Sequence, residues 1–283
     1  MVIGFWNIGN NTDIGDLLIE FVKENEIDIL FLAETKFKKE RNTKCPDVVL
    51  DFLTKSKILF STPFVQLPDL DFRVKALTKI SSSLFDLKKK EVKSSRWSAY
   101  HLEIPSLIRM NLFPVHFHSK NNWSHISQAL ECVNLSQDIS KIESLTKCNN
   151  TLLIGDFNMN PFDFGMVSSN GLNAISSLEY VTDNPIGRKV DGSHYRFLYN
   201  PMWNFFGDQS KPMATYYYRS SGHVSHEYHI LDQIILSGTM KQYLTSNCVQ
   251  IVTKIGGINL AAIYDRPNEI YSDHFPIKIK LKI

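Results

Sequence analysis

The sequence lacks the cysteine patterns that hold small secreted domains or zinc sites together. Its 4 cysteines are far apart and include no C-x-x-C pair, so neither a zinc knuckle nor a dense disulfide framework is predicted. No apolar run approaches the ~20 residues that a membrane-spanning helix needs. The first residues, MVIGFWNIGNN, lack the basic region, long apolar region and cleavage site of a signal peptide. We therefore predict a cytoplasmic protein in a reducing compartment.

An excess of charge of one sign and flexible linkers are also missing. Lysine and arginine number 31 and aspartate and glutamate 29, which leaves a net charge of +2. This balance neither demands nor excludes a polyanionic partner, because nucleic-acid binding depends on how basic residues cluster. The apolar fraction of 43% and charged fraction of 21% are those of an ordinary globular protein. With no internal repeat and no Gly/Ser/Pro-rich linker, residues 1–283 are predicted to form a single domain.

The N-terminal part of the chain reads as a strand, a helix and a second strand. Apolar runs at residues 2–8 and 27–34 are typical of strands buried on both faces. A strand-helix-strand unit usually pairs its strands in parallel, so both strands end at the same edge of the sheet. Ligands bind at that edge in open α/β sheets. We therefore predict that Asn7 and Glu34, at the ends of the two strands, converge.

Two helices are predicted from the 3.6-residue period of the apolar residues. The first begins at Ile14, and any of three preceding residues can cap it: Asn11, Thr12 or Asp13. The second is capped by Ser124 and carries an apolar stripe made of Ile126, Leu130, Val133, Ile139, Ile142 and Leu145.

Most of the remaining chain is predicted to be strands and loops. Residues 36–95 are expected to form short antiparallel strands, and residues 96–104 and 110–118 a hairpin. A strand is predicted at 151–156. Within LLIGDFN, residues 152–158, Gly155 is expected to break this strand and turn the chain outward. Further strands are predicted at 215–219, 229–237, 247–253 and 274–283.

Polar residues recur at the ends of these predicted strands. A rigid scaffold presents chemical groups accurately at such positions. A carboxylate is costly to bury there unless it is paired or binds a metal, so several together suggest a shared cation. The residues in question are Asn7, Glu34, His116, Asp156, Asn158, Asp232, Asp273 and His274.

In chain order, the segments FWNI, LFLAET, VHFHS, IGDFNMNP, ILDQIILS and YSDHFPI resemble the six motif blocks of the endonuclease/exonuclease/phosphatase superfamily, whose members resemble pancreatic-type deoxyribonuclease. The resemblance extends from residue 3 to residue 279. GDFN alone is moderately specific and SDH alone is weak, whereas six blocks in order are specific. The resemblance implies an α/β (α+β) fold, a four-layer sandwich of two packed mixed β-sheets flanked by helices.

The chemistry that the resemblance implies is metal-assisted hydrolysis of a phosphoester. Mg²⁺ suits a site of this kind because it takes oxygen ligands and keeps several waters, and Mn²⁺ is an expected substitute. Glu34 is the first candidate ligand. Asn7, through its amide oxygen, and Asp273 are the further candidates.

The remaining roles also follow from the resemblance. Asp156 orients or deprotonates the attacking water, and Asn158 donates to a phosphate oxygen. Their spacing of two would put both side chains on one face of an extended chain. Asp232 holds the ring of His274, which acts on the phosphate or the nucleophile.

His116 is predicted to be an acid or a phosphate contact on the opposite side of the site. Family members pair the equivalent histidine with a glutamate from an earlier strand, and residues 60–80 contain Asp69 and Asp71 but no glutamate. Arg96 matches a block in which family members carry an arginine near the phosphate. His118, two residues after His116, is left out of the predicted site.

The leading hypothesis is a DNA endonuclease. Basic segments at 36–41 and 88–96 and the aromatic loop at 202–206 favour a nucleic-acid substrate. The alternative is a phosphatase or phosphodiesterase of an inositol phosphate, a sphingolipid or another small phosphoester, since motifs define the reaction better than the substrate. An inactive binding module ranks last, because no motif is broken.

Two other readings concern the segment 215–229. A zinc cluster of His223, His226 and His229 is a minor alternative, because a spacing of three suits neither one strand face nor one helix face. Tyr216 and Tyr218 either stack on bases or belong to the core.

Overall fold

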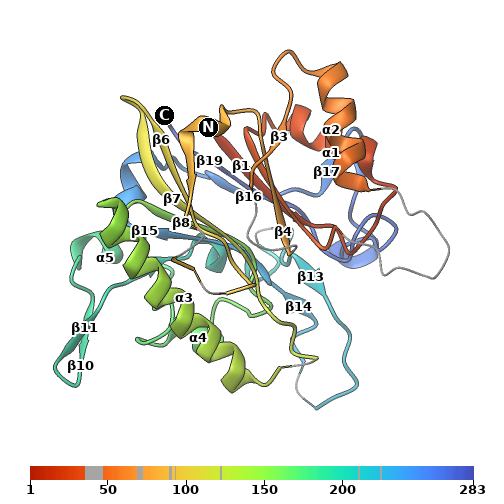
Figure 1. Cartoon of the computed structure of the whole chain (residues 1–283). Helices are drawn as coiled ribbons and strands as arrows, with labels where there is room; N and C mark the ends of the chain where they lie inside the picture. Colours follow the sequence, from red (N-terminus) through yellow and green to blue (C-terminus); the bar gives the residue numbers. More distant parts are fainter. Residues whose placement is uncertain are drawn as a thin grey trace.

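The computed structural model describes residues 1–35, 47–68, 73–88, 91–92, 94–121, 123–209, 211–223 and 225–283. Two large mixed sheets pack face to face (Figure 1). The six-stranded sheet has the order β16 (Val249–Ile251), β19 (Ile277–Lys280), β1 (Val2–Asn7), β2 (Ile29–Ala33), β4 (Val74–Thr78) and β3 (Val65–Gln66). The seven-stranded sheet has the order β5 (Phe85–Leu87), β6 (Tyr100–Ile104), β7 (Ile108–His116), β8 (Thr151–Asp156), β15 (Asp232–Ser237), β12 (Leu198–Tyr199) and β9 (Ala174–Ile175).

Helices cover the outer faces of both sheets. In Figure 1, α1 and α2 lie over the six-stranded sheet, and α3 and α4 lie over the seven-stranded sheet. The helices are α1 (Gly15–Glu24), α2 (Val48–Leu59), α3 (His125–Thr146), α4 (Phe164–Val167) and α5 (Leu178–Asp183). Three two-stranded ribbons complete the described strands: β10 (Arg188–Val190) with β11 (Ser193–Tyr195), β13 (Tyr216–Tyr217) with β14 (Tyr228–His229), and β17 (Lys254–Ile255) with β18 (Ile258–Asn259). No described helix has the length and apolar character that crossing a bilayer requires.

Strand alternation divides the core into two buried clusters. Successive side chains of a strand point to opposite faces of the sheet. On β8, Leu152 and Ile154 therefore join the cluster between the two sheets, where Phe5 and Phe31 also lie. Leu153 points the other way, into a second cluster beneath α3. This is the predicted four-layer sandwich.

Pairing within each sheet brings the predicted polar residues to one edge. β1 and β2 are parallel, as predicted, with Asn7 opposite Ala33 and Glu34 following directly. In the other sheet, β7 runs parallel to β8, and β15 runs antiparallel to β8. Asp156 is therefore the register partner of both His116 and Asp232.

Gly155 has a different structural role from the predicted one. β8 does not end there but continues to Asp156. The φ angle of Gly155 is +154°, and a Cβ atom at this position would lie 1.9 Å from the carbonyl oxygen of Val115 on β7. A glycine is therefore required for the close approach of two backbones, which keeps Asp156 level with His116.

Three helix predictions need correction. The segment 36–95 contains α2, whose N-cap Asp47 accepts hydrogen bonds from the N–H groups of Val49 and Leu50. In α3, capped by Ser124 as predicted, the buried stripe is Ala129, Cys132, Leu135, Ile139 and Ile142.

Of the predicted α3 stripe, Ile126, Leu130 and Leu145 are instead 75%, 58% and 53% exposed. For α1, none of the three predicted side chains provides a cap, since Ile14 is the N-cap residue. The Asn11 carbonyl oxygen Oδ1 instead accepts from the N–H of Asp13.

Replacing Gly155 by alanine should destabilise the fold strongly. The added Cβ would overlap the Val115 carbonyl, and overpacking against backbone costs ~1–3 kcal/mol or more. Gly192→Ala is the matched control, because Gly192 also has a positive φ but no atom within 4 Å of its Cβ position. Chemical denaturation should show a larger loss of unfolding free energy for Gly155→Ala than for Gly192→Ala. Equal losses would contradict the close-approach account.

Candidate functional site

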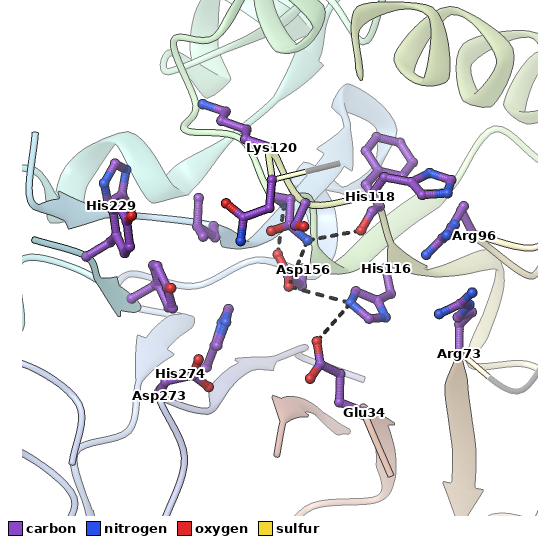
Figure 2. Close-up of a pocket in the computed structure, with 17 residues that line it drawn as sticks. Glu34, Arg73, Arg96, His116, His118, Lys120, Asp156, His229, Asp273 and His274 are labelled. Carbon is purple, nitrogen blue, oxygen red and sulfur yellow. Dashed lines mark hydrogen bonds and ion pairs between the residues drawn. The ribbon is translucent and has the colours of Figure 1, made fainter. Parts of the chain in front are cut away.

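A cleft of about 600 Å³ opens at the edge where the carboxyl ends of β2, β7 and β8 meet (Figure 2). Glu34 lines it from the six-stranded sheet, and His116 and Asp156 line it from the seven-stranded sheet. His274, in the segment before β19, lines it as well. Both sheets therefore contribute polar groups to one cavity.

Glu34 lies just beyond β2 in a left-handed conformation, with φ at +50°. Its Oε1 accepts a hydrogen bond from Asn7 Nδ2 at 3.3 Å, and its Oε2 accepts from Asn10 Nδ2 at 3.1 Å. His116 Nε2 lies 3.4 Å from Oε1. The hydrogen bond from His116 is the main reason that the pKa of Glu34 falls to about 2, despite partial burial. His116 is thus paired with Glu34, whereas Asp69 and Asp71 lie outside the described residues.

Asp156 is buried and held by three donors. Its Oδ1 accepts from the backbone N–H of Asn158 at 2.8 Å, and its Oδ2 accepts from Asn7 Nδ2 at 3.1 Å and Asn158 Nδ2 at 3.2 Å. Burial raises the pKa of Asp156 above the usual aspartate value. His116 Nε2 lies 3.8 Å from Oδ2. The side chain is therefore oriented from both sheets.

Asn158 reaches Asp156 by a different route from the predicted one. It does not continue the alternation of β8, because its φ is +51°, in the left-handed region. A tight turn after the strand brings the two side chains together, and Asn158 Nδ2 also donates to the carbonyl oxygen of Phe117 at 3.0 Å. Asparagine tolerates this backbone conformation better than most residues.

Asp232 and His274 form a buried pair, with Asp232 Oδ2 2.7 Å from His274 Nδ1. The N–H of Asp232 donates to the hydroxyl of Thr215, and the N–H of His274 donates to the hydroxyl of Ser272. Burial lowers the pKa of His274, but the charge and hydrogen bond of Asp232, together with the charges of Asp156 and Asp273, outweigh it and raise the pKa to about 10. The ring is therefore an imidazolium at neutral pH.

The predicted metal ligands are arranged unequally. Glu34 and Asp273 line the cleft, whereas Asn7 is 1% exposed and lies behind it. Asn7 turns its amide nitrogen toward the carboxylates, while its Oδ1 accepts from the N–H of Gly9 at 3.1 Å. Its amide would have to rotate for the oxygen to bind a cation.

A second set of potential ligand atoms consists of Asp156, Asp232 and His274, which lie within 4.8 Å of one another. The Nδ1 atom of His274 is occupied by Asp232, and an imidazolium has no lone pair for a metal. We therefore regard this set as a hydrogen-bonded acid/base group.

Basic residues line the cleft beside His116. Arg96 is there as predicted, and its carbonyl oxygen accepts from the N–H of His116 at 2.8 Å. Arg73 and Lys120 also line the cleft, although no sequence motif identifies them. Figure 2 shows both arginines on the side of the cleft where His116 lies.

Of the segments expected to favour nucleic acid, residues 36–41 lie outside the described residues, as do Lys89, Lys90 and Lys93. In the aromatic loop, Trp203 and Phe206 pack against Phe162 instead of lining the cleft.

Tyr216 and Tyr218 do line the cleft. The ring of Tyr216 lies 4.7 Å from that of His274, centroid to centroid. The two tyrosines are therefore placed at the cleft and not in the core between the sheets.

His118 and the histidines of 223–229 have other contacts. His118 Nδ1 binds Glu131 Oε1 at 2.6 Å, and its ring stacks on Trp123. His229 pairs with Asn160. Among the described residues, His223, His226 and His229 form no group of metal-ligating atoms.

Comparisons with known proteins identify the fold. No family model matches the sequence, and no curated protein matches it either. Among solved structures, an endonuclease/exonuclease/phosphatase family protein from Leptotrichia buccalis C-1013-b is similar over 100% of both chains, at 14% identity and a TM-score of 0.57.

D. rerio TDP2 complexed with single strand DNA product is similar over 100% of this chain and 99% of that chain, at 15% identity and a TM-score of 0.55. The human Nocturnin catalytic domain with bound sulfate is similar over 99% and 93%, at 16% identity and a TM-score of 0.52. Identities this low show the fold alone, and the predicted fold is confirmed.

The charge state of Glu34 should depend on His116. In metal-free protein, His116→Ala removes the hydrogen bond that lowers the pKa of Glu34, so this pKa should rise from about 2 toward 4.5. Carbon-13 NMR of labelled glutamate in EDTA measures the change. His118→Ala is the control, because His118 lines the same cleft but binds Glu131. A wild-type Glu34 that titrates near 4.5 would contradict the pairing.

Proposed function

We propose that this chain, which has the fold of the endonuclease/exonuclease/phosphatase superfamily, is a phosphoester hydrolase, and more specifically a Mg²⁺-dependent phosphodiesterase that cleaves DNA. The observation that carries the proposal is the convergence of Glu34, Asp156 and His274, from three separate motif blocks, on one cleft. Two of these groups have strongly shifted pKa values, Glu34 at about 2 and His274 at about 10. Such shifts are concentrated at functional sites.

Mg²⁺ would be held by Glu34 and Asp273. The fit rests on the donor set: the Glu34 carboxylate stays ionised at neutral pH, its side chain is 35% exposed in the cleft, and Asp273 lines the same cavity. Oxygen ligands of this kind suit Mg²⁺, and Mn²⁺ can replace it. When bound, the cation would stabilise negative charge on the phosphoryl oxygens.

Asp156 would orient the attacking water. Its raised pKa makes it a stronger base than an ordinary aspartate, and three donors hold its carboxylate in place. Asn158 would donate to a phosphate oxygen by exchanging its contact with Asp156 Oδ2 for the substrate. Asp156 ends β8 and Asn158 lies in the turn directly after it, so the water and the phosphate would be positioned together.

His274 would stabilise the charge that develops on the phosphate. Because Asp232 occupies Nδ1, the ring has only Nε2 to offer the substrate. An imidazolium donates a charge-assisted hydrogen bond, which favours contact with a phosphate oxygen over removal of a proton from water. His116 would be an acid or a phosphate contact on the opposite side of the cleft. Glu34 would hold its ring in place through the contact with Nε2.

The preference for DNA rests on charge and on two similar structures. Arg73, Arg96 and Lys120 line the cleft and suit a polyanion. The similar TDP2 and Neisseria NExo structures hold a single strand DNA product and a product DNA hairpin, respectively. NExo is a 3' phosphatase, so a small phosphoester is the alternative substrate.

Hydrolysis should require the cation and the acid/base groups. With Mg²⁺, wild-type protein should cleave supercoiled plasmid or single-stranded DNA, and EDTA should abolish cleavage. Asp156→Asn and His274→Gln should each lower kcat by about 10²–10⁴-fold, because each removes a transition-state contact. Asp191→Asn, an exposed turn residue outside the cleft, is the control.

The substrate assignment is tested in the same assay with RNA, inositol phosphates and sphingomyelin. If one of these substrates is hydrolysed rapidly while DNA stays uncleaved, the DNA assignment is wrong and the assignment as a phosphoester hydrolase stands. Wild-type rates in Asp156→Asn would contradict the proposed site.

Glu34→Gln should weaken Mg²⁺ binding. The substitution keeps the shape and removes the charge that a hard cation requires. Titration calorimetry should show a weaker affinity by at least about tenfold, one decade per ~1.4 kcal/mol. Glu131→Gln is the control, because Glu131 is bound to His118 outside the proposed ligand set. Unchanged affinity in Glu34→Gln would remove Glu34 from the ligands.

A further inference from the structure

His229 lines the cleft, yet the mechanism above gives it no role. It ends β14 and is half-buried. Figure 2 shows it across the cleft from Arg73 and Arg96, with Asp156 between the two sides. What a histidine in this position can offer a ligand depends on which of its ring nitrogens carries a proton.

Asn160 determines which nitrogen of His229 carries the proton. The backbone N–H of Ile230 can only donate, and it donates to Asn160 Oδ1 at 2.9 Å. The amide nitrogen of Asn160 must therefore face His229 Nδ1, at 3.0 Å. Since an amide nitrogen also only donates, Nδ1 accepts and the neutral ring carries its proton on Nε2.

The ring is neutral and its Nε2 proton is free for a ligand. Burial lowers the pKa of His229, and the ammonium of Lys120 lowers it further, against a smaller opposing effect of Asp163. Within the described residues, the only hydrogen bond of the ring is the one with Asn160. His229 is therefore a fixed, uncharged donor at the wall of the cleft.

Strand register locates this donor relative to the proposed reaction centre. The backbone of Tyr216 pairs with that of His229 in the β13–β14 ribbon. It also forms an isolated antiparallel β-bridge with the backbone of His274. Neighbouring strands lie about 4.8 Å apart, so the backbones of His229 and His274 are separated by roughly 10 Å. A phosphate in contact with His274 would therefore leave His229 to meet a neighbouring group of the substrate.

Lys120 adds a positive charge on the same side. It lines the cleft, and its Nζ binds Asp163 Oδ2 at 2.6 Å, which leaves further N–H groups on the ammonium. Both Lys120 and His229 line the cleft, and the charge of Lys120 lowers the pKa of His229. Asp163 holds Lys120 in place and offsets part of its charge.

We propose that His229 and Lys120 form a subsite for a second phosphate, one that flanks the phosphate under attack. The inference rests on the proposed phosphoesterase function and narrows its substrate class to molecules with successive phosphates, such as a polynucleotide strand. A substrate with a single phosphate gains nothing from this subsite. His229 and Lys120 would determine specificity and leave the bond-breaking step unchanged.

The kinetic test compares a thymidine hexanucleotide, which has several phosphates, with bis(p-nitrophenyl) phosphate, which has one. His229→Ala should raise KM for the hexanucleotide by about tenfold to 100-fold, the loss expected for one hydrogen bond to a charged group. It should leave kcat for the hexanucleotide and both constants for bis(p-nitrophenyl) phosphate unchanged. His229→Gln keeps an N–H donor and should recover part of the loss.

His226→Ala is the matched control, because the ring of His226 packs 6.3 Å from that of His229 but does not line the cleft. Equal effects of His229→Ala on both substrates, or none on the hexanucleotide, would overturn the proposal.

Two measurements remain informative without turnover. Nitrogen-15 NMR of the histidine rings should find His229 protonated on Nε2, and a bare Nε2 would overturn the inference. If wild-type protein hydrolyses no phosphoester, the proposed function fails, and the subsite is then judged by hexanucleotide binding alone. His229→Ala should weaken that binding about tenfold or more while His226→Ala does not, and equal affinities would reject the subsite.

Discussion

The hydrogen bond from Asn7 to Asp156 connects the two sheets at the point where the candidate site forms. Asn7 ends β1 in one sheet and Asp156 ends β8 in the other, and the two side chains meet at 3.1 Å. This contact exists because the sheets pack over a shared core with their strand ends aligned. Without that alignment, Glu34 and His116 would belong to separate surfaces. The remaining geometry of the cleft depends on it.

Paired charges make such a cleft tolerable in the folded protein. Buried carboxylates are costly unless they are hydrogen-bonded or paired. Asp232 is matched by His274 and Glu34 by His116, and backbone and amide donors satisfy Asp156. The pairing has opposite consequences for the two proposed roles: it keeps Glu34 anionic for a cation and His274 cationic for a phosphate. A purely structural core would have little need of five ionisable groups at one edge.

Several strands, the two helices and the convergence of the first two candidate residues could be predicted from local patterns, whereas the sandwich fold and the roles of the site residues were predicted from the resemblance of six motif blocks. Parallel pairing of two buried strands was enough to bring Asn7 and Glu34 together. The failures arise where tertiary contacts override local pattern. Residues 36–95 were predicted to form short strands, but the Asp47 cap and the burial of Val48, Val49 and Phe52 make α2 a helix. No spacing rule could reveal that Glu34 lies beside His116, since they meet only when the sheets pack. The tautomer of His229 likewise depends on Asn160, which is 69 positions away.

The central claim is that Glu34, Asp156 and His274 act as one catalytic unit. Its most direct test is kcat/KM for single-stranded DNA with Mg²⁺ in the double variant Asp156→Asn/His274→Gln, compared with both single variants. Residues that serve one transition state show strongly non-additive losses. The account predicts that the double variant loses little more than the worse single variant. Losses that multiply, as for two independent sites, would contradict it.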